Sequence, residues 1–157
     1  MILTVVLTLF LFLTPRTLDD VPESQTPKQE EPRTQLDTRL REFLEIKKSP
    51  LVSDVEFLLK LKHWKLLIAI SAIESQYCQY QLGYNCWGIS GNEHYRYYNS
   101  FRAAAQDAND LIESWQVKGK WLTVEDMNCS YIVPCSPNWV RVVNQNLKIL
   151  NELETKK

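Results

Sequence analysis

The feature that most constrains the fold is a run of apolar residues from Leu66 to Ile73 that ends at Glu74. Its side chains point in nearly every direction around a helix, and a helix that is apolar all round has to be buried. At helical spacing Glu74 stacks above Ile70. A carboxylate in an apolar setting is costly, so it is paired, raised in pKa, or turned toward a cleft. We therefore expect a central helix over 65–77, with Glu74 near its end at the floor of a groove.

A simpler interpretation is that Glu74 marks the point where this helix returns to water. From position alone that interpretation is favoured, because a glutamate is rarely buried without a partner. A carboxyl that stays protonated near neutral pH can instead act as a general acid. The choice between the two depends on the rest of the chain.

Length and charge limit the possible functions. The chain has 157 residues, which suits one compact domain, and its 18 basic and 19 acidic residues give a net charge of -1. The sequence has no basic run and therefore gives no indication of nucleic-acid binding. We expect neither a metal nor another cofactor, and a monomeric protein.

The four cysteines fall into two close pairs, Cys78 with Cys86 and Cys129 with Cys135. An even number at short spacings suits two disulfides in an oxidising compartment, although other pairings remain open. Zinc is a weaker alternative, because C-x7-C and C-x5-C differ from the usual C-x2-C spacing and neither histidine falls into a ligand pattern.

The N-terminal region divides into two parts. Residues 1–14 hold an uncharged apolar run that is too short to span a bilayer and suits the core of a signal peptide. No basic residue precedes the run and no small-residue cleavage site follows it, so a short membrane anchor or a buried strand remain alternatives. Residues 15–35 are rich in Pro, Glu and Gln and predict a disordered linker. We expect an exported protein, extracellular, periplasmic or at the cell surface, whose folded domain spans 36–157.

Periodicity and capping signals predict a mainly α domain with a small β-hairpin. A helix is expected over 36–47, and the Ser-Pro pair at 49–50 predicts a new helix start. After a break near 62–63 comes the central helix. Residues 87–98 are rich in aromatics, Gly and Asn, which is typical of a loop with a hairpin. Further helices are expected after residues that can cap them: Asn99 or Ser100, Thr123, and Ser136.

Aromatic residues gather in the hairpin region. Trp87, Tyr95 and Tyr97 offer flat faces with polar edges, which are suited to stacking on sugar rings. For any single one of them, a place in a minor core under the loop is the simpler expectation.

Four short motifs in order then indicate a family. They are Ala72-Ile73-Glu74-Ser75, Asn85-Cys86-Trp87-Gly88-Ile89, Tyr98-Asn99-Ser100-Phe101, and Tyr131 before Trp139-Val140. The set spans about residues 49–152 and resembles the lysozyme-like glucosaminidases of bacterial autolysins and flagellar muramidases, which are relatives of the lytic transglycosylases. This group includes domains of the mannosyl-glycoprotein endo-β-N-acetylglucosaminidase type.

The resemblance implies a lysozyme-like helical domain that cleaves β-1,4 bonds in peptidoglycan or a related N-acetylhexosamine glycan. It makes Glu74 the general acid and points Tyr131 at the sugar. Glu93 lies where some relatives carry a second carboxylate, although a turn residue without a special role is slightly preferred. The residues placed at the substrate are Ser75, Asn85, Trp87, Gly88 and Ile89, with Tyr95 and Tyr97 from the hairpin.

Several alternatives stay open. The second catalytic group could be Glu93, the acetamido group of the substrate assisted by Tyr131, or none, if the product is an anhydro-sugar as in lytic transglycosylases. A different class of function is a wall-binding or assembly module on the same scaffold that no longer cleaves. A third is a cysteine peptidase using Cys86 and His94, which is disfavoured because Cys78 is an obvious partner for Cys86.

Overall fold

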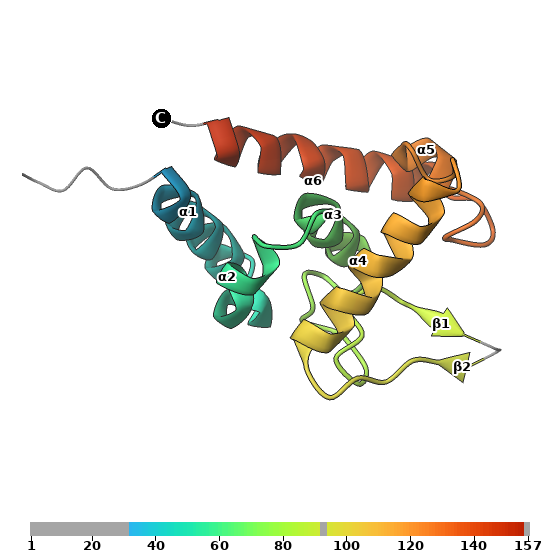
Figure 1. Ribbon diagram of the computed structural model, residues 1–157, viewed down its shortest axis with the longest axis horizontal. Coiled ribbons are helices and arrows are strands. Elements are labelled where there is room, and N and C mark those ends of the chain that lie inside the picture. Colours follow the sequence, from blue (N-terminus) through green and yellow to red (C-terminus); the bar gives the residue numbers. More distant parts are fainter. Residues whose placement is uncertain (1–31, 92–93, 156–157) are drawn as a thin grey trace, which may run out of the picture.

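The structure is a computed structural model, and it describes residues 32–91 and 94–155 (Figure 1). The predicted N-terminal segment 1–14, residues 15–31 of the predicted linker, and Glu93 lie outside the described residues. The linker prediction was wrong for residues 32–35, because a helix begins at Pro32, a residue that is well suited to the first helical turn. Across the part of the chain that is described, no helix is both long enough and apolar enough to cross a membrane.

The described chain is mainly helical with a small antiparallel hairpin, which confirms the predicted fold class. The elements in order are α1 (Pro32–Ile46), the 3-10 helix η1 (Pro50–Asp54), α2 (Val55–Leu58), α3 (Trp64–Glu74), β1 (Ser90–Gly91), β2 (His94–Tyr95), α4 (Phe101–Val117), α5 (Val124–Met127) and α6 (Pro137–Thr155).

Helix starts follow the predicted caps. Ser100 accepts a hydrogen bond from the Ala103 N–H at 3.2 Å, and Ser136 accepts one from Trp139 N–H at 3.2 Å. Thr123 opens α5 with a capping box, as its spacing to Asp126 predicts. Such caps satisfy backbone donors that the first helical turn leaves free, which is why local sequence predicts them well.

Four elements differ from expectation in length: α1, the helix after Ser49, the hairpin, and α3, which is described below. The helix expected after Ser49 is a 3-10 turn followed by the single turn of α2. The hairpin strands are shorter than the predicted segment 87–98, with Ser90 opposite Tyr95 and Gly91 opposite His94. Beyond them the Arg96 N–H still donates to the Ile89 carbonyl at 3.1 Å, and the Tyr98 N–H then donates to the Gly83 carbonyl at 2.9 Å, outside the hairpin.

The central helix α3 is buried, as its all-round apolar sequence predicts. Leu67, Ile68 and Ala69 are 0% exposed. α3 packs most extensively against α6 and also contacts α4, and Figure 1 shows it beneath α6 between α1 and α4. The core of the molecule therefore surrounds the element that ends at Glu74.

This helix ends three residues earlier than predicted. Gln76, Tyr77 and Cys78 adopt positive φ angles of 49°, 57° and 68°, which a right-handed helix cannot contain. The N–H groups of Ser75 and Tyr77 both reach back to the Ser71 carbonyl, at 3.1 and 2.8 Å, and close the helix end. Glu74 is consequently the last residue of α3 rather than an interior one.

Candidate functional site

Glu74 lies half-buried at the C-terminal end of α3, and the indole of Trp139 defines its position. The Nε1–H of Trp139 donates to Oε1 of Glu74 at 2.7 Å. Burial raises the pKa of Glu74, and the hydrogen bond from Trp139 opposes that shift in part. Within the described residues no Lys, Arg or His forms an ion pair with this carboxyl. Burial therefore dominates its protonation and favours the neutral acid.

The second oxygen of Glu74 faces Gly88. A Cβ added to Gly88 would lie 3.1 Å from Oε2, and the residue has a φ of +63°, a conformation that favours glycine. Gly88 itself is exposed. Because Gly88 has no side chain, it does not block access from solvent to Oε2.

Asn85 shapes the loop that carries Gly88. Its side-chain oxygen accepts from the N–H groups of Trp87 and Ile89 at 3.3 and 3.0 Å, and its amide donates to the Ile89 carbonyl at 2.7 Å. Asn85 is 1% exposed. The structure thus places Asn85 behind the site, where it holds the loop in shape.

Trp87 and Ile89 also lie beneath the surface. Trp87 is 0% exposed, and its Nε1–H donates to the Leu67 carbonyl at 2.8 Å. Ile89 is 4% exposed. Their side chains form the floor below Gly88 and offer no face for stacking on a ligand, which matches the core interpretation that the sequence left open.

Tyr131 reaches the same region from the loop after α5. Its hydroxyl donates to the Trp87 carbonyl, and its ring lies 5.5 Å from that of Trp139 at an angle of 34°. Burial, together with the nearby charge of Glu74, raises the pKa of Tyr131 well above its ordinary value. Tyr131 is therefore a neutral phenol close to the Glu74 carboxyl.

The hairpin contributes less to the described site. The Tyr95 hydroxyl donates to the Asn85 carbonyl at 2.7 Å, so it supports the same loop. Tyr97 is 66% exposed and its ring lies 5.8 Å from that of Tyr95. Tyr97 is therefore accessible to a ligand. The role predicted for Glu93 stays a prediction, because this residue lies outside the described part of the chain.

Both predicted disulfides are present, Cys78–Cys86 and Cys129–Cys135. The first joins the chain just after α3 to the segment before Gly88. Ser75 supports this bridge, because its hydroxyl donates to the Cys86 carbonyl at 2.8 Å and accepts from the Cys78 N–H at 3.1 Å. With Cys86 in a disulfide, the cysteine-peptidase alternative has no free thiol.

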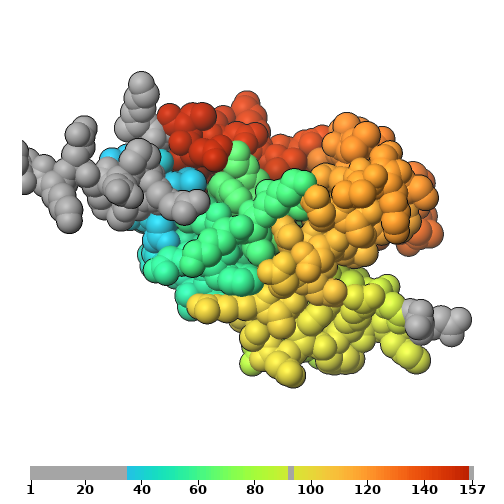
Figure 2. Space-filling model, in the orientation of Figure 1, coloured from blue at the N-terminus to red at the C-terminus, as the bar shows by residue number. Residues whose placement is uncertain are grey.

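The groups around Glu74 come from two lobes. Gly88 belongs to the loop that leads into the hairpin, whereas Tyr131 and Trp139 flank the start of α6. Figure 2 shows the hairpin region in yellow-green and the α5 region in orange standing apart at one side of the molecule, with a recess between them. The end of the buried helix thus lies close to residues from both lobes.

Sequence reasoning missed Trp139 as the hydrogen-bond donor to Glu74. From the sequence we named Trp139 only within the fourth motif and gave it no role, and the residue is 1% exposed. The one available signal was its place after Tyr131 in the last of the four motifs.

No protein-family model, curated protein or solved structure matches the chain.

Proposed function

We propose that this protein cleaves β-1,4 glycosidic bonds in N-acetylated glycan strands, with peptidoglycan as the favoured substrate and Glu74 as the general acid. The observation that carries the proposal is the carboxyl at the end of α3, where burial raises its pKa and no basic partner among the described residues neutralises it. A general acid has to hold its proton until the substrate arrives, and burial favours that form.

The two carboxyl oxygens have different surroundings, which suggests where the proton sits. Oε1 accepts the indole N–H of Trp139, and this hydrogen bond favours Oε1 as the oxygen without the proton. Oε2 faces Gly88, where no side chain stands in the way. We assign the proton to Oε2, from which it would pass to the leaving oxygen of the glycan.

Cleavage of the glycosidic bond also requires a group that assists Glu74. No other carboxylate among the described residues contributes to the pKa shift of Glu74. This supports participation by the acetamido group of the substrate, in which its carbonyl oxygen attacks the sugar carbon as the glycosidic bond breaks. Tyr131 lies near the carboxyl as a neutral hydroxyl, and Glu93 remains the alternative second carboxylate.

We further propose that the protein acts after export. Both disulfides require an oxidising environment to form and persist. A bacterial cell wall lies in such a compartment, so the redox requirement and the proposed substrate agree.

The test is the cleavage of purified peptidoglycan by wild-type protein and by Glu74→Gln, followed as new reducing ends and anhydro-sugars. Glutamine keeps an acceptor for Trp139 but has no proton to give, so we expect the rate to fall at least ~100-fold with an unchanged fold by circular dichroism. Glu42→Gln, an exposed change on α1, is the matched control and should cleave like wild type.

Wild-type activity in Glu74→Gln would remove this residue from the mechanism. Binding of wild-type protein to peptidoglycan without any product would favour the wall-binding module instead. Reducing ends and anhydro-sugars separate hydrolysis from transglycosylation.

A further inference from the structure

A second concave site lies between the C-terminal end of α4 and α5, apart from Glu74. This hollow has a volume of about 540 Å³, and its lining includes Trp115, Lys120, Leu122 and Asp126. We refer to it as the distal hollow. Its wall combines an indole surface with an ammonium group, so it has both an apolar and a cationic part.

A continuous row of aromatic rings connects the distal hollow to the Glu74 site. The rings of Trp115 and Trp121 stack with centroids 4.8 Å apart and planes 12° apart. Trp121 lies 5.5 Å from Tyr131, and Tyr131 lies 5.5 Å from Trp139, the residue that binds Glu74. The two sites are therefore only a few side chains apart and share one packed support.

Trp121 is held firmly in this row. It is 5% exposed, and its Nε1–H donates to the Ser130 hydroxyl at 2.5 Å. Its backbone has a φ of 53°, which is rare for a bulky residue and persists only where the surroundings enforce it. The stacked indole of Trp115 consequently has a rigid backing.

The lining of the distal hollow carries one basic and one acidic side chain, Lys120 and Asp126. Lys120 Nζ lies 4.8 Å from the centre of the Trp115 ring and forms no ion pair within the described ranges. The carboxylate of Asp126 accepts from the Thr123 N–H at 2.9 Å, which holds it at the start of α5. The ammonium group of Lys120 is thus the group in the hollow that can bind an anion.

We propose that the distal hollow is a subsite for a carboxylate-bearing peptide attached to the glycan strand whose sugar backbone lies at Glu74. The proposal rests on the proposed function. Leu122, which is 64% exposed, offers an apolar surface for the peptide, and Lys120 provides a positive charge for its carboxylate. An uncharged glycan would reach Glu74 equally well but would leave Lys120 without a partner.

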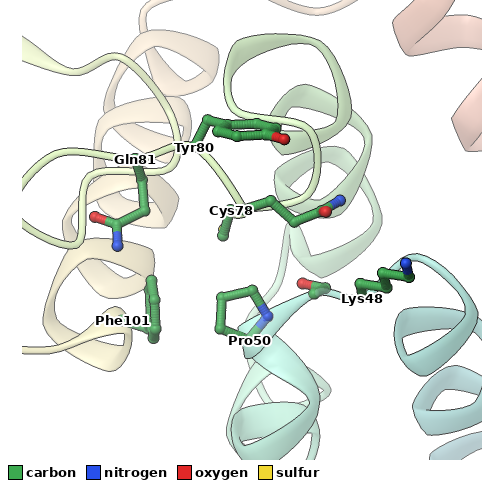
Figure 3. A pocket seen from close by; sticks show the side chains of 8 residues that line it. Lys48, Pro50, Cys78, Tyr80, Gln81 and Phe101 are labelled. Atoms are coloured by element: carbon green, nitrogen blue, oxygen red, sulfur yellow. The ribbon is translucent and has the colours of Figure 1, made fainter.

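Another hollow of about 550 Å³ provides a matched control (Figure 3). It is lined in part by Lys48, Pro50, Tyr80 and Phe101, and so it also combines a lysine with aromatic rings. None of the ring contacts from the distal hollow to Glu74 involves these residues. Lys48→Gln removes a positive charge there without touching the row.

The experiment measures binding by calorimetry in proteins that carry Glu74→Gln, so that cleavage does not interfere. One probe is a soluble disaccharide–peptide fragment of peptidoglycan, and the other is an uncharged N-acetylglucosamine oligosaccharide. We expect Lys120→Gln to weaken binding of the peptide-bearing fragment by about 5- to 10-fold, as for one charge-assisted contact, and more at low salt. Binding of the oligosaccharide should not change, and Lys48→Gln should change neither.

Unchanged binding of the fragment by Lys120→Gln would overturn the proposal, as would equal losses for both probes, an equal loss with Lys48→Gln, or no binding of the fragment at all. The proposed function can fail separately. If wild-type protein cleaves nothing but the Lys120 effect on the fragment persists, the distal hollow stands as a binding site while the glycosidase proposal falls.

Discussion

The two disulfide loops that flank Glu74 differ in burial although they are similar in size. The bridged residues are 8 apart for Cys78–Cys86 and 6 apart for Cys129–Cys135. A disulfide that closes a loop this short should stabilise the folded protein by about 2–3 kcal/mol, because it lowers the conformational entropy of the unfolded chain. The first bridge is almost fully buried, with its cysteines 1% and 0% exposed, whereas both cysteines of the second are exposed.

Each loop delivers a different part of the site. The buried bridge holds the segment that places Gly88 against Glu74, and the exposed bridge closes the loop that carries Tyr131. The Tyr131 hydroxyl joins the two loops by donating to the Trp87 carbonyl. The difference teaches that the disulfide on one side of the carboxyl is built into the core, whereas the disulfide on the other side lies at the surface.

The largest expected effect comes from removing the bridges in turn. Cys78→Ala with Cys86→Ala should lower the free energy of unfolding by about 3–5 kcal/mol, because a buried void adds to the lost cross-link. Cys129→Ala with Cys135→Ala should cost only about 2 kcal/mol. Urea unfolding followed by circular dichroism measures both. Equal losses would mean that burial of the first bridge adds nothing.

The next test concerns the glycine beside the acid. Gly88 and Gly119 have similar φ angles of +63° and +70°, but only Gly88 has a neighbour within reach of an added Cβ. Alanine at either position should cost about 1 kcal/mol from backbone strain. We expect Gly88→Ala to lower the free energy of unfolding more than Gly119→Ala does, because the added methyl group crowds Glu74 Oε2. The same crowding should slow glycan cleavage about 10-fold.

Thermal unfolding of the two glycine variants, with cleavage assays for Gly88→Ala, checks this expectation. If both variants melt at the same temperature and Gly88→Ala cleaves normally, a methyl group at position 88 does not crowd Glu74, and the prediction is wrong.

The smallest effect is a pH dependence of stability. The pKa of Glu74 is raised in the folded protein, so the folded state binds this proton more tightly than the unfolded chain does. The resulting stabilisation is complete below the unfolded pKa, about 4.3, and is lost as pH rises through the folded pKa. Glu74→Gln carries no charge and should therefore melt above wild type at neutral pH, with the difference shrinking toward about pH 4.

Thermal melts at a series of pH values provide the measurement, and Glu42→Gln should show no such trend. A Glu74→Gln protein that gains stability relative to wild type as pH falls would indicate the opposite, namely that the folded protein favours the carboxylate.

Local chemistry predicted much of the fold. Ser100, Thr123 and Ser136 each cap the helix that follows, because the residue type and its position before the helix suffice for that role. The apolar run before Glu74 likewise predicted burial of α3. These are properties of short segments, so they can be seen without knowing how the chain folds.

Features of the site that depend on distant contacts could not be seen in this way. The early end of α3 depends on positive φ angles at non-glycine residues, including Gln76, and these are stabilised by contacts around the disulfide. Asn85 belongs to a residue type common in binding sites, yet its side chain forms hydrogen bonds with the backbone of its own loop. Trp139 meets Glu74 only because α6 folds back over α3.

The dependence of Glu74 on Trp139 ties its acidity to the point at which α6 begins. Ser136 accepts from the Trp139 N–H at 3.2 Å and so determines the first turn of that helix. A shift of the chain by one residue along this helix would move the indole by about 1.5 Å along the axis and turn it by about 100°. The pKa of Glu74 thus depends in part on the Ser136 hydroxyl, which caps a helix that begins far away in sequence.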